Sequence, residues 1–136
     1  MSESREHKNL VELCYQYIKT LVDSENVDLI NVDSNDTFGS SLIDYQYVPD
    51  VLYCYQGNLI IGEAKTSKDF LRKHSIAQYE AYVNQCKEFY GNATIVIAVP
   101  WTEMITAKNY FRQQKKSINK NIKIVIINDF GKKEIL

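Results

Sequence analysis

The sequence lacks the features that mark membrane proteins, secreted proteins and proteins held together by disulfides. No run approaches the roughly 18 consecutive apolar residues of a membrane-spanning helix, and the polar N-terminus carries no signal-peptide pattern. Cys14, Cys54 and Cys86 are odd in number and far apart, so they fit neither a disulfide framework nor a zinc or iron–sulfur site. All three lie in apolar stretches, and we expect reduced core cysteines in a cytoplasmic protein.

A large excess of one charge is also absent. The formal net charge is −1, so any binding of nucleic acid must depend on a local patch rather than on the whole surface. The 136 residues suit one domain covering 1–136, and a hydrophobic content of 45% is enough for a packed core. These values exclude a disordered or low-complexity chain.

Apolar periodicity predicts an α/β fold. Helical spacing covers 4–23, 75–90 and 102–118, and β-rich runs occupy 27–32, 48–55, 58–65, 93–99 and 122–127. Ser75-x-x-Gln78 fits a capping box that would open the second helix, and the polar segment 33–46 is typical of a loop. The expected order is α-β-β-β-α-β-α-β, a mixed central β-sheet flanked by helices.

One predicted hairpin brings charged residues together. Gln56-Gly57 separates two β-rich runs and is typical of a tight turn. In a two-residue turn, counting back along both strands places Asp50 directly opposite Glu63, on the same face of the sheet. Lys65 shares that face because residues two apart on a strand point the same way. A three-residue turn would shift the register by one and separate these side chains.

Such a cluster suits phosphodiester hydrolysis. Two directly opposed carboxylates repel each other, and a divalent cation between Asp50 and Glu63 would turn that repulsion into a binding site. Mg²⁺ prefers carboxylate oxygens and keeps several waters, one of which it makes more acidic. A lysine beside it, here Lys65, can orient the attacking water or stabilise developing negative charge.

The motifs resemble those of the PD-(D/E)XK nuclease superfamily, with its restriction-endonuclease-like core. Pro49-Asp50 followed by Glu63-Ala64-Lys65 matches its signature, and Gln78-x-x-x-Tyr82 is similar to an element of its RecB-like branch, near the Holliday-junction resolvases. The resemblance implies Mg²⁺ or Mn²⁺ held by Asp50, Glu63 and the Ala64 carbonyl, with Lys65 and Gln78 assisting catalysis. No cysteine cluster is present, which argues against the iron–sulfur nucleases of this superfamily.

An acid on the first helix also supports the metal in that superfamily. The apolar stripe of this helix is expected to centre near Leu10, Tyr17 and Leu21. Glu6 falls inside this stripe and is the preferred catalytic and metal-binding candidate, whereas Glu12 points toward solvent. Glu3, nearer the end of the helix, is second. Glu6 could instead merely favour the helix dipole.

Each site residue also has a structural interpretation. Asp50 could be a turn residue after Pro49, and Gln78 could serve only as part of a helix cap. Glu63 and Lys65 could lie on a solvated edge strand. The apolar run 59–61 just before them instead indicates a central strand, where charged side chains need a reason.

Basic residues supply a possible path for a phosphate backbone. One cluster, Lys68, Arg72 and Lys73, directly follows the motif, and a second occupies the acid-free stretch 104–128 with Arg112, Lys115 and Lys116. The second cluster could also be the solvated face of a helix.

Together these features predict a Mg²⁺-dependent nuclease, an endonuclease that acts on DNA. We expect it to form a homodimer and not to associate with a membrane. The polar segment 33–46 is the expected place for substrate recognition. An RNA-cleaving or nucleotide-regulated effector nuclease on the same fold, and an inactive nucleic-acid-binding module, remain the alternatives. A basic track beside an acidic site is what a phosphodiester substrate requires.

Overall fold

The computed structural model describes residues 4–33, 47–118 and 121–136. Its helices and strands are α1 (Arg5–Lys19), the 3₁₀ helix η1 (Ser24–Leu29), β1 (Asn31–Val32), β2 (Val51–Tyr55), β3 (Asn58–Ala64), α2 (Lys73–Glu88), β4 (Asn92–Val99), the 3₁₀ helix η2 (Trp101–Glu103), α3 (Met104–Lys116), β5 (Ile122–Asn128) and β6 (Lys133–Ile135). The expected order is therefore present and is extended by one strand, β6.

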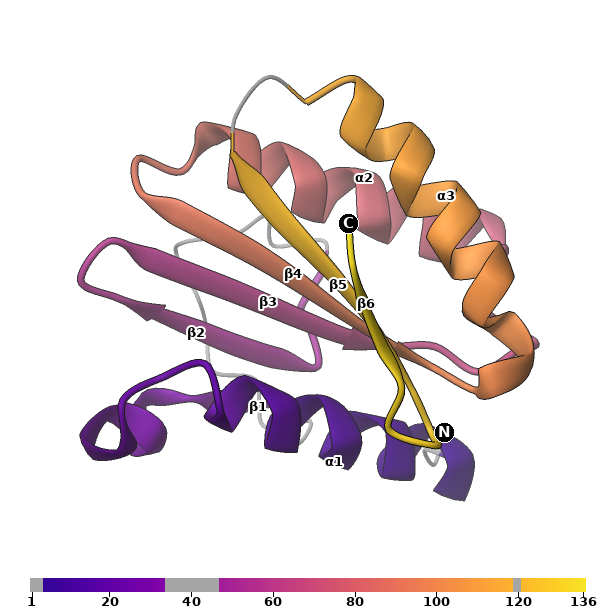
Figure 1. Ribbon diagram of the computed structural model, residues 1–136, viewed down its shortest axis with the longest axis horizontal. Helices are drawn as coiled ribbons and strands as arrows, with labels where there is room; N and C mark the ends of the chain where they lie inside the picture. The colour runs from indigo at the N-terminus through magenta and orange to yellow at the C-terminus, as the bar shows by residue number, and fades with distance from the viewer. Residues whose placement is uncertain (1–3, 34–46, 119–120) are drawn as a thin grey trace.

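The strands form one six-stranded mixed sheet in the order β1-β2-β3-β4-β5-β6. β3, β4 and β5 run parallel, and the remaining neighbours pair antiparallel. Helix α1 covers one face of the sheet, and α2 and α3 cover the other (Figure 1). The carboxyl ends of the three parallel strands therefore lie at one edge of the sheet, between these helical layers.

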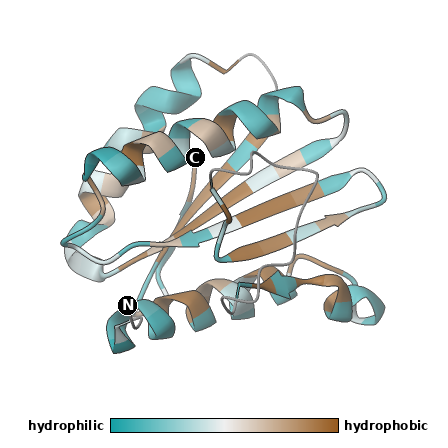
Figure 2. Cartoon of the chain, turned by 180° about the vertical axis from the view of Figure 1, so that it is seen from behind, coloured by the Kyte–Doolittle hydropathy of each residue, from teal (hydrophilic) through white to brown (hydrophobic). Residues whose placement is uncertain are grey.

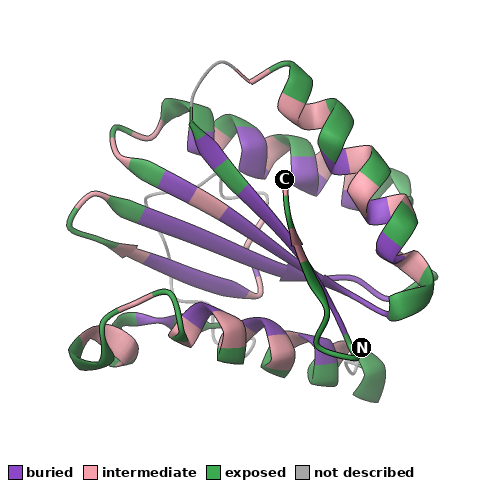
Figure 3. Cartoon of the chain, in the orientation of Figure 1, coloured by how far each residue is buried: buried purple, intermediate pink, exposed green. Residues whose placement is uncertain are grey.

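Two hydrophobic clusters hold the layers together. Alternate residues of the central strands face α1 on one side and α2 with α3 on the other. The central strands are accordingly hydrophobic along most of their length (Figure 2), and β3 is buried at every position after its first residue (Figure 3). The interpretation of 59–61 as part of a central strand is confirmed.

The hairpin turn has the geometry that its sequence predicted. Gln56 and Gly57 both have positive φ angles, 48° and 78°, as a two-residue type I′ turn requires. Tyr55 pairs with Asn58, and the pairing continues in step to Val51 and Gly62. The predicted register is confirmed, because the next position outward places residue 50 beside residue 63.

Several predicted boundaries are wrong. The first half of the segment 27–32 belongs to the 3₁₀ helix η1, and only its last two residues form a strand, paired with β2. Helix α1 ends at Lys19 rather than near residue 23. Helix α2 begins at Lys73, with Arg72 in an extended conformation before it, so Ser75 lies inside the helix and the capping box is not formed. Substrate recognition was expected in 33–46, and all of this segment except Asp33 lies outside the described residues.

None of the three cysteines forms a disulfide bond, and two are fully buried. Cys14 and Cys86 lie in the core, and Cys54 is half-buried. This agrees with their prediction as reduced residues. Among the described helices, none is long and apolar enough to cross a membrane.

Gly62 permits the close approach of α1 to β3. A Cβ atom at this position would lie 2.6 Å from Cys14 Sγ and 2.8 Å from Ile18 Cδ1. We therefore expect Gly62→Ala to lower the free energy of unfolding by about 1–3 kcal/mol, measured by urea denaturation. The loss should be smaller in a Cys14→Ala background, where the sulfur is absent. An equal loss in both backgrounds would contradict this contact.

Candidate active site

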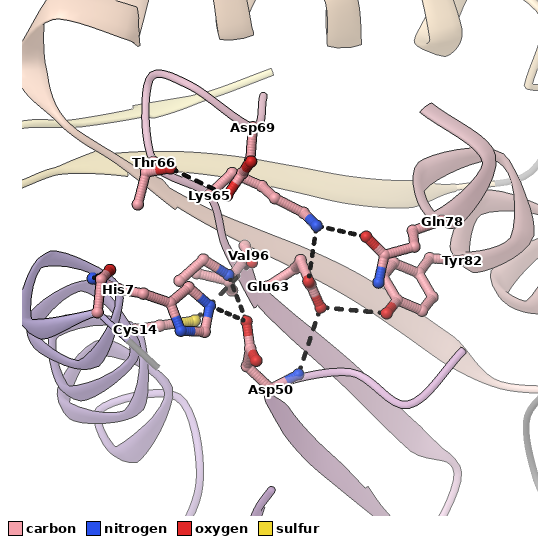
Figure 4. A network of polar contacts seen from close by, with 12 residues as sticks. His7, Cys14, Asp50, Glu63, Lys65, Thr66, Asp69, Gln78, Tyr82 and Val96 are labelled. Atoms are coloured by element: carbon pink, nitrogen blue, oxygen red, sulfur yellow. Dashed lines mark hydrogen bonds and ion pairs between the residues drawn. The ribbon is translucent and has the colours of Figure 1, made fainter. Parts of the chain in front are cut away.

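Asp50 and Glu63 are joined at the open end of the β2–β3 hairpin (Figure 4). The backbone N–H of Asp50 donates to Glu63 Oε1 over 3.3 Å, and the backbone N–H of Ala64 donates to Asp50 Oδ2 over 2.9 Å. This reciprocal pair of hydrogen bonds fixes both carboxylates to the backbone of the neighbouring strand. The site therefore follows directly from the hairpin register.

The two carboxylates are reached from different helical layers. Asp50 lies in a bend just before β2, and its Oδ2 is 3.3 Å from Nε2 of His7 on α1. Glu63 instead accepts a hydrogen bond of 3.1 Å from the hydroxyl of Tyr82 on α2. We expected the two side chains to share one face of the sheet. The contacts place them between α1 and α2, at the edge of the sheet.

Glu63 is a buried acid with an unusual protonation equilibrium. Its exposed fraction is 3%. Burial and the nearby negative charge of Asp50 raise the pKa of Glu63 to about 8, against the opposing effects of Lys65, Tyr82 and the Asp50 N–H. A raised carboxyl pKa in such a cluster is typical of functional sites. A bound cation would favour the charged form of this group.

Lys65 lies between Glu63 and helix α2. Its Nζ is 3.4 Å from Glu63 Oε2 and donates a hydrogen bond to Gln78 Oε1. The backbone N–H of Lys65 donates to the Ala98 carbonyl over 3.0 Å, which holds this residue to β4. The buried ammonium thus has two oxygen acceptors and a fixed direction. Gln78 therefore contacts Lys65 of the motif directly, and its role is not limited to capping a helix.

His7 is the residue of α1 that reaches the site, and sequence reasoning missed it. The buried stripe of α1 is Leu10, Cys14 and Ile18. At about 100° per residue, His7 lies about 20° from the mean direction of this stripe, and Glu6 lies about 80° from it. The predicted stripe included Leu21, which lies beyond the helix and is exposed. The burial of Cys14, a residue type often found inside proteins, was the available signal.

Glu6 has a different environment from the one expected. Its side chain is exposed, and it borders a cavity of about 280 Å³ together with Asn9, Leu10, Leu13 and Asp129. Glu12 is exposed and accepts a hydrogen bond of 2.6 Å from Gln16. Glu3 lies outside the described residues. The structure therefore brings together Asp50, Glu63, Lys65 and Gln78, and adds His7 rather than Glu6.

The residues present suit a hard divalent cation. Within 4–33, 47–118 and 121–136, no three His, Cys, Asp or Glu side chains are grouped so as to hold a metal ion by themselves. Mg²⁺ nevertheless needs only one or two carboxylates when it keeps several waters. Asp50 and Glu63 provide two, and their mutual repulsion raises the pKa of Glu63. The donor set therefore fits Mg²⁺ or Mn²⁺.

The two basic clusters lie at different edges of the sheet. Lys68 and Arg72 are exposed on the segment that connects the end of β3 to α2, and Lys73 is exposed at the first position of α2. At the other edge, Lys115 Nζ donates to the carbonyl of Ile122, the first residue of β5, over 2.7 Å. The carboxyl end of α3, with Lys116, lies far from the carboxyl ends of the parallel strands (Figure 1). Arg112 lies one helical turn before Lys116.

The function of this site rests on its own geometry. Comparisons with protein-family models, with curated proteins and with solved structures give no match. The residues that define the site are an acid pair, a buried lysine with a glutamine acceptor, a tyrosine donor and a histidine.

Tyr82 and Tyr79 offer a matched test of how Glu63 is positioned. The Tyr82 hydroxyl donates to Glu63, whereas the Tyr79 hydroxyl donates to the Phe70 carbonyl over 2.8 Å. Either Tyr→Phe change should cost about 1–3 kcal/mol in free energy of unfolding, because it removes a hydrogen bond to a buried acceptor. Only Tyr82→Phe removes a hydrogen bond that lowers the pKa of Glu63.

We therefore expect Tyr82→Phe to lower the predicted nuclease activity roughly 10- to 100-fold and to move the acidic limb of its pH profile upward. The Tyr79→Phe profile should match that of the wild type. Initial cleavage rates across pH provide the measurement. Identical profiles for both variants would show that Tyr82 has only a structural role.

Proposed function

We propose that this protein is a metal-dependent nuclease that hydrolyses phosphodiester bonds in DNA, with the restriction-endonuclease-like core of the PD-(D/E)XK superfamily. The observation that carries the proposal is the contact network of Asp50, Glu63 and Lys65, which lie where β2 begins and β3 ends. A mixed sheet flanked by helices on both faces supports it.

In this mechanism the protein positions the reacting groups. Asp50 and Glu63 would hold Mg²⁺ or Mn²⁺, and the ion would supply Lewis-acid polarisation of the phosphate and a bound water of lowered pKa. Lys65 directs its ammonium at the attacking water or at the charge that develops on the phosphate. Gln78 and Tyr82 act as positioning residues for Lys65 and Glu63, respectively. His7, which faces Asp50, is a candidate third group of the site.

A cleavage panel tests the proposal directly. Purified protein is incubated with plasmid, single-stranded DNA, a four-way junction and RNA, each with Mg²⁺, Mn²⁺ or EDTA. We expect metal-dependent cleavage of DNA and none in EDTA. Cleavage of RNA alone would show that the substrate is RNA rather than DNA. If the folded protein cleaves none of these substrates, the nuclease proposal is wrong. Sedimentation of the same sample tests the proposed homodimer.

The positions of the two basic clusters predict different salt effects. Neutralising Lys68 and Lys73 together should weaken DNA binding, because each phosphate contact releases condensed cations. The slope of log affinity against log salt should fall by roughly 0.9 per lost contact on a duplex. Lys115→Gln with Lys116→Gln is the matched control, since these side chains lie at the other edge of the sheet.

Binding is measured with Ca²⁺ in place of Mg²⁺ at several salt concentrations. The control variant should keep the wild-type slope. The reverse pattern, a reduced slope only for the Lys115 and Lys116 variant, would place the DNA path along α3 instead.

A further inference from the structure

Two large aromatic side chains are exposed side by side near the candidate active site. Trp101 is 56% exposed and Phe130 is 78% exposed. Their ring centroids are 6.3 Å apart, with an angle of 43° between the ring planes. Scattered surface hydrophobic residues need no explanation, but an adjacent exposed pair beside a functional site is a candidate binding surface.

Hydrogen bonds fix the two loops that carry these rings. The backbone N–H of Trp101 donates to Asp129 Oδ1 over 2.8 Å, which ties the loop after β4 to the loop after β5. The buried Asn128 accepts from the backbone N–H groups of Phe130 and Lys132, over 2.9 and 3.1 Å. The backbone thus holds both exposed rings in place, and a ligand would meet a preorganised surface.

The fold places this surface close to the acid pair. β3, β4 and β5 are parallel, and Ala64, Ala98 and Ile127 lie level across them. Neighbouring strands lie roughly 4.8 Å apart, so the loops after β4 and β5 lie about 5–10 Å sideways from the end of β3. Ser67 Oγ and Thr102 Oγ1, 3.2 Å apart, join the segment after Lys65 to the Trp101 loop.

We propose that Trp101 and Phe130 form a stacking platform for an unpaired base of the substrate. The inference rests on the proposed nuclease function and narrows its substrate to nucleic acid with unpaired bases, such as a single strand or a frayed end. A sideways distance of about 5–10 Å corresponds to about two or three stacked nucleotides on one strand. A base stacked on the rings and a phosphate at Asp50 and Glu63 can therefore belong to one short strand.

The chemistry of the platform favours a base as its occupant. Every unpaired base has a flat π face that stacks on aromatic rings regardless of sequence, whereas bases inside a duplex already stack on each other. Exposed Lys68 and Lys132 lie in the two flanking loops and suit the phosphates on either side of such a base. Two aromatic side chains bury at most about 500 Å², less than the roughly 800 Å² per partner of a stable protein interface.

Trp101 gives the test its readout, because it is the only tryptophan in the sequence. Wild-type protein in Ca²⁺ is titrated with an oligothymidylate and, separately, with a closed hairpin duplex of the same length. We expect saturable quenching of tryptophan fluorescence by the single strand and little change with the hairpin. Binding is measured in parallel by the anisotropy of a labelled oligothymidylate.

Variants of Phe130 distinguish stacking by the aromatic ring from simple hydrophobic contact. Phe130→Leu should bind the single strand roughly 5- to 100-fold more weakly, the range expected for one lost base–aromatic stack, and Phe130→Tyr should restore binding. Tyr90→Leu is the matched control. Tyr90 is 83% exposed, and its ring lies 3.9 Å from the Cβ position of Gly57, at the turn end of the hairpin. The Tyr90→Leu protein should therefore bind the single strand as tightly as the wild type does.

Equal quenching by strand and hairpin, no quenching, or unchanged binding by Phe130→Leu would each overturn the platform. A fluorescence change with protein concentration alone, lost in Phe130→Leu, would assign the pair to self-association instead. Quenching without cleavage on any panel substrate would retain the platform and remove the nuclease function. Cleavage without quenching would retain the nuclease function and rule out the platform.

Discussion

We expect the Glu63→Gln protein to lose metal-dependent cleavage while remaining folded. The change removes the buried carboxylate that lies between Tyr82, Lys65 and the Asp50 N–H. Loss of an outer-shell partner already costs roughly 10- to 100-fold in activity or metal affinity. Loss of a metal-binding carboxylate should therefore reduce cleavage by more than about 100-fold. Initial rates with Mg²⁺ provide the measurement.

The stability of the same variant separates a catalytic role from a structural one. Glutamine keeps an oxygen acceptor at this position and is neutral at every pH, so the folded protein no longer has to bury a carboxyl group whose ionisation burial and Asp50 disfavour. The thermal midpoint without metal should therefore hold or rise. Asp50→Asn and Lys65→Ala should also abolish cleavage, and the exposed Glu12→Gln on α1 should behave as wild type. Full activity in any of the three site variants would remove that residue from the mechanism.

The metal-free protein should lose stability relative to Glu63→Gln as the pH rises from about 4.5 to about 8. The pKa of Glu63 is raised in the folded protein from an ordinary value of 4.5 to about 8. Between these values the folded state holds a proton that the unfolded chain has released. The stabilising contribution of this proton is complete below the lower value and is lost as pH passes the higher one. Urea denaturation of both proteins across pH measures the difference.

The proton on Glu63 should also affect metal binding, but in the opposite direction: rising pH lowers the stability of the metal-free protein and raises its affinity for Mg²⁺. Mg²⁺ requires the charged carboxylate, so binding below pH about 8 must release a proton and becomes stronger as pH rises. The Mg²⁺-dependent rise in thermal midpoint should therefore grow up to that pH and level off above it. Titration calorimetry in buffers of different ionisation enthalpy counts the proton. An affinity that stays flat from about pH 6 to about pH 8 would contradict a protonated Glu63 in the metal-free site.

Local sequence determined the features that depend on neighbouring residues. Gln56-Gly57 can adopt two consecutive positive φ angles, so it set the turn type. The two-residue period of a strand then set the register up to Gly62 and brought residues 50 and 63 together. The β-rich runs 93–99 and 122–127 indicated the strands β4 and β5, which are buried over most of their length because helices cover both faces of the sheet.

Only the tertiary structure decided which distant residues meet. His7 rather than Glu6 faces Asp50 because the packing of α1 on β3 turns the helix about Cys14, and the end of the helix removes Leu21 from the stripe. Gln78 accepts a hydrogen bond from Lys65 instead of capping a helix, because α2 begins three residues earlier than its capping pattern indicated and Gln78 lies inside the helix.

The same reason applies to the surfaces. Helix α3 begins near the carboxyl ends of the parallel strands, where the site lies, and runs away from them. Its last residues, Lys115 and Lys116, therefore lie at the other edge of the sheet. Trp101 and Phe130, far apart in sequence, meet because β4 and β5 run parallel and end level. Periodicity reports which side of an element is buried, whereas the neighbour that buries it is chosen by the packing of the whole chain.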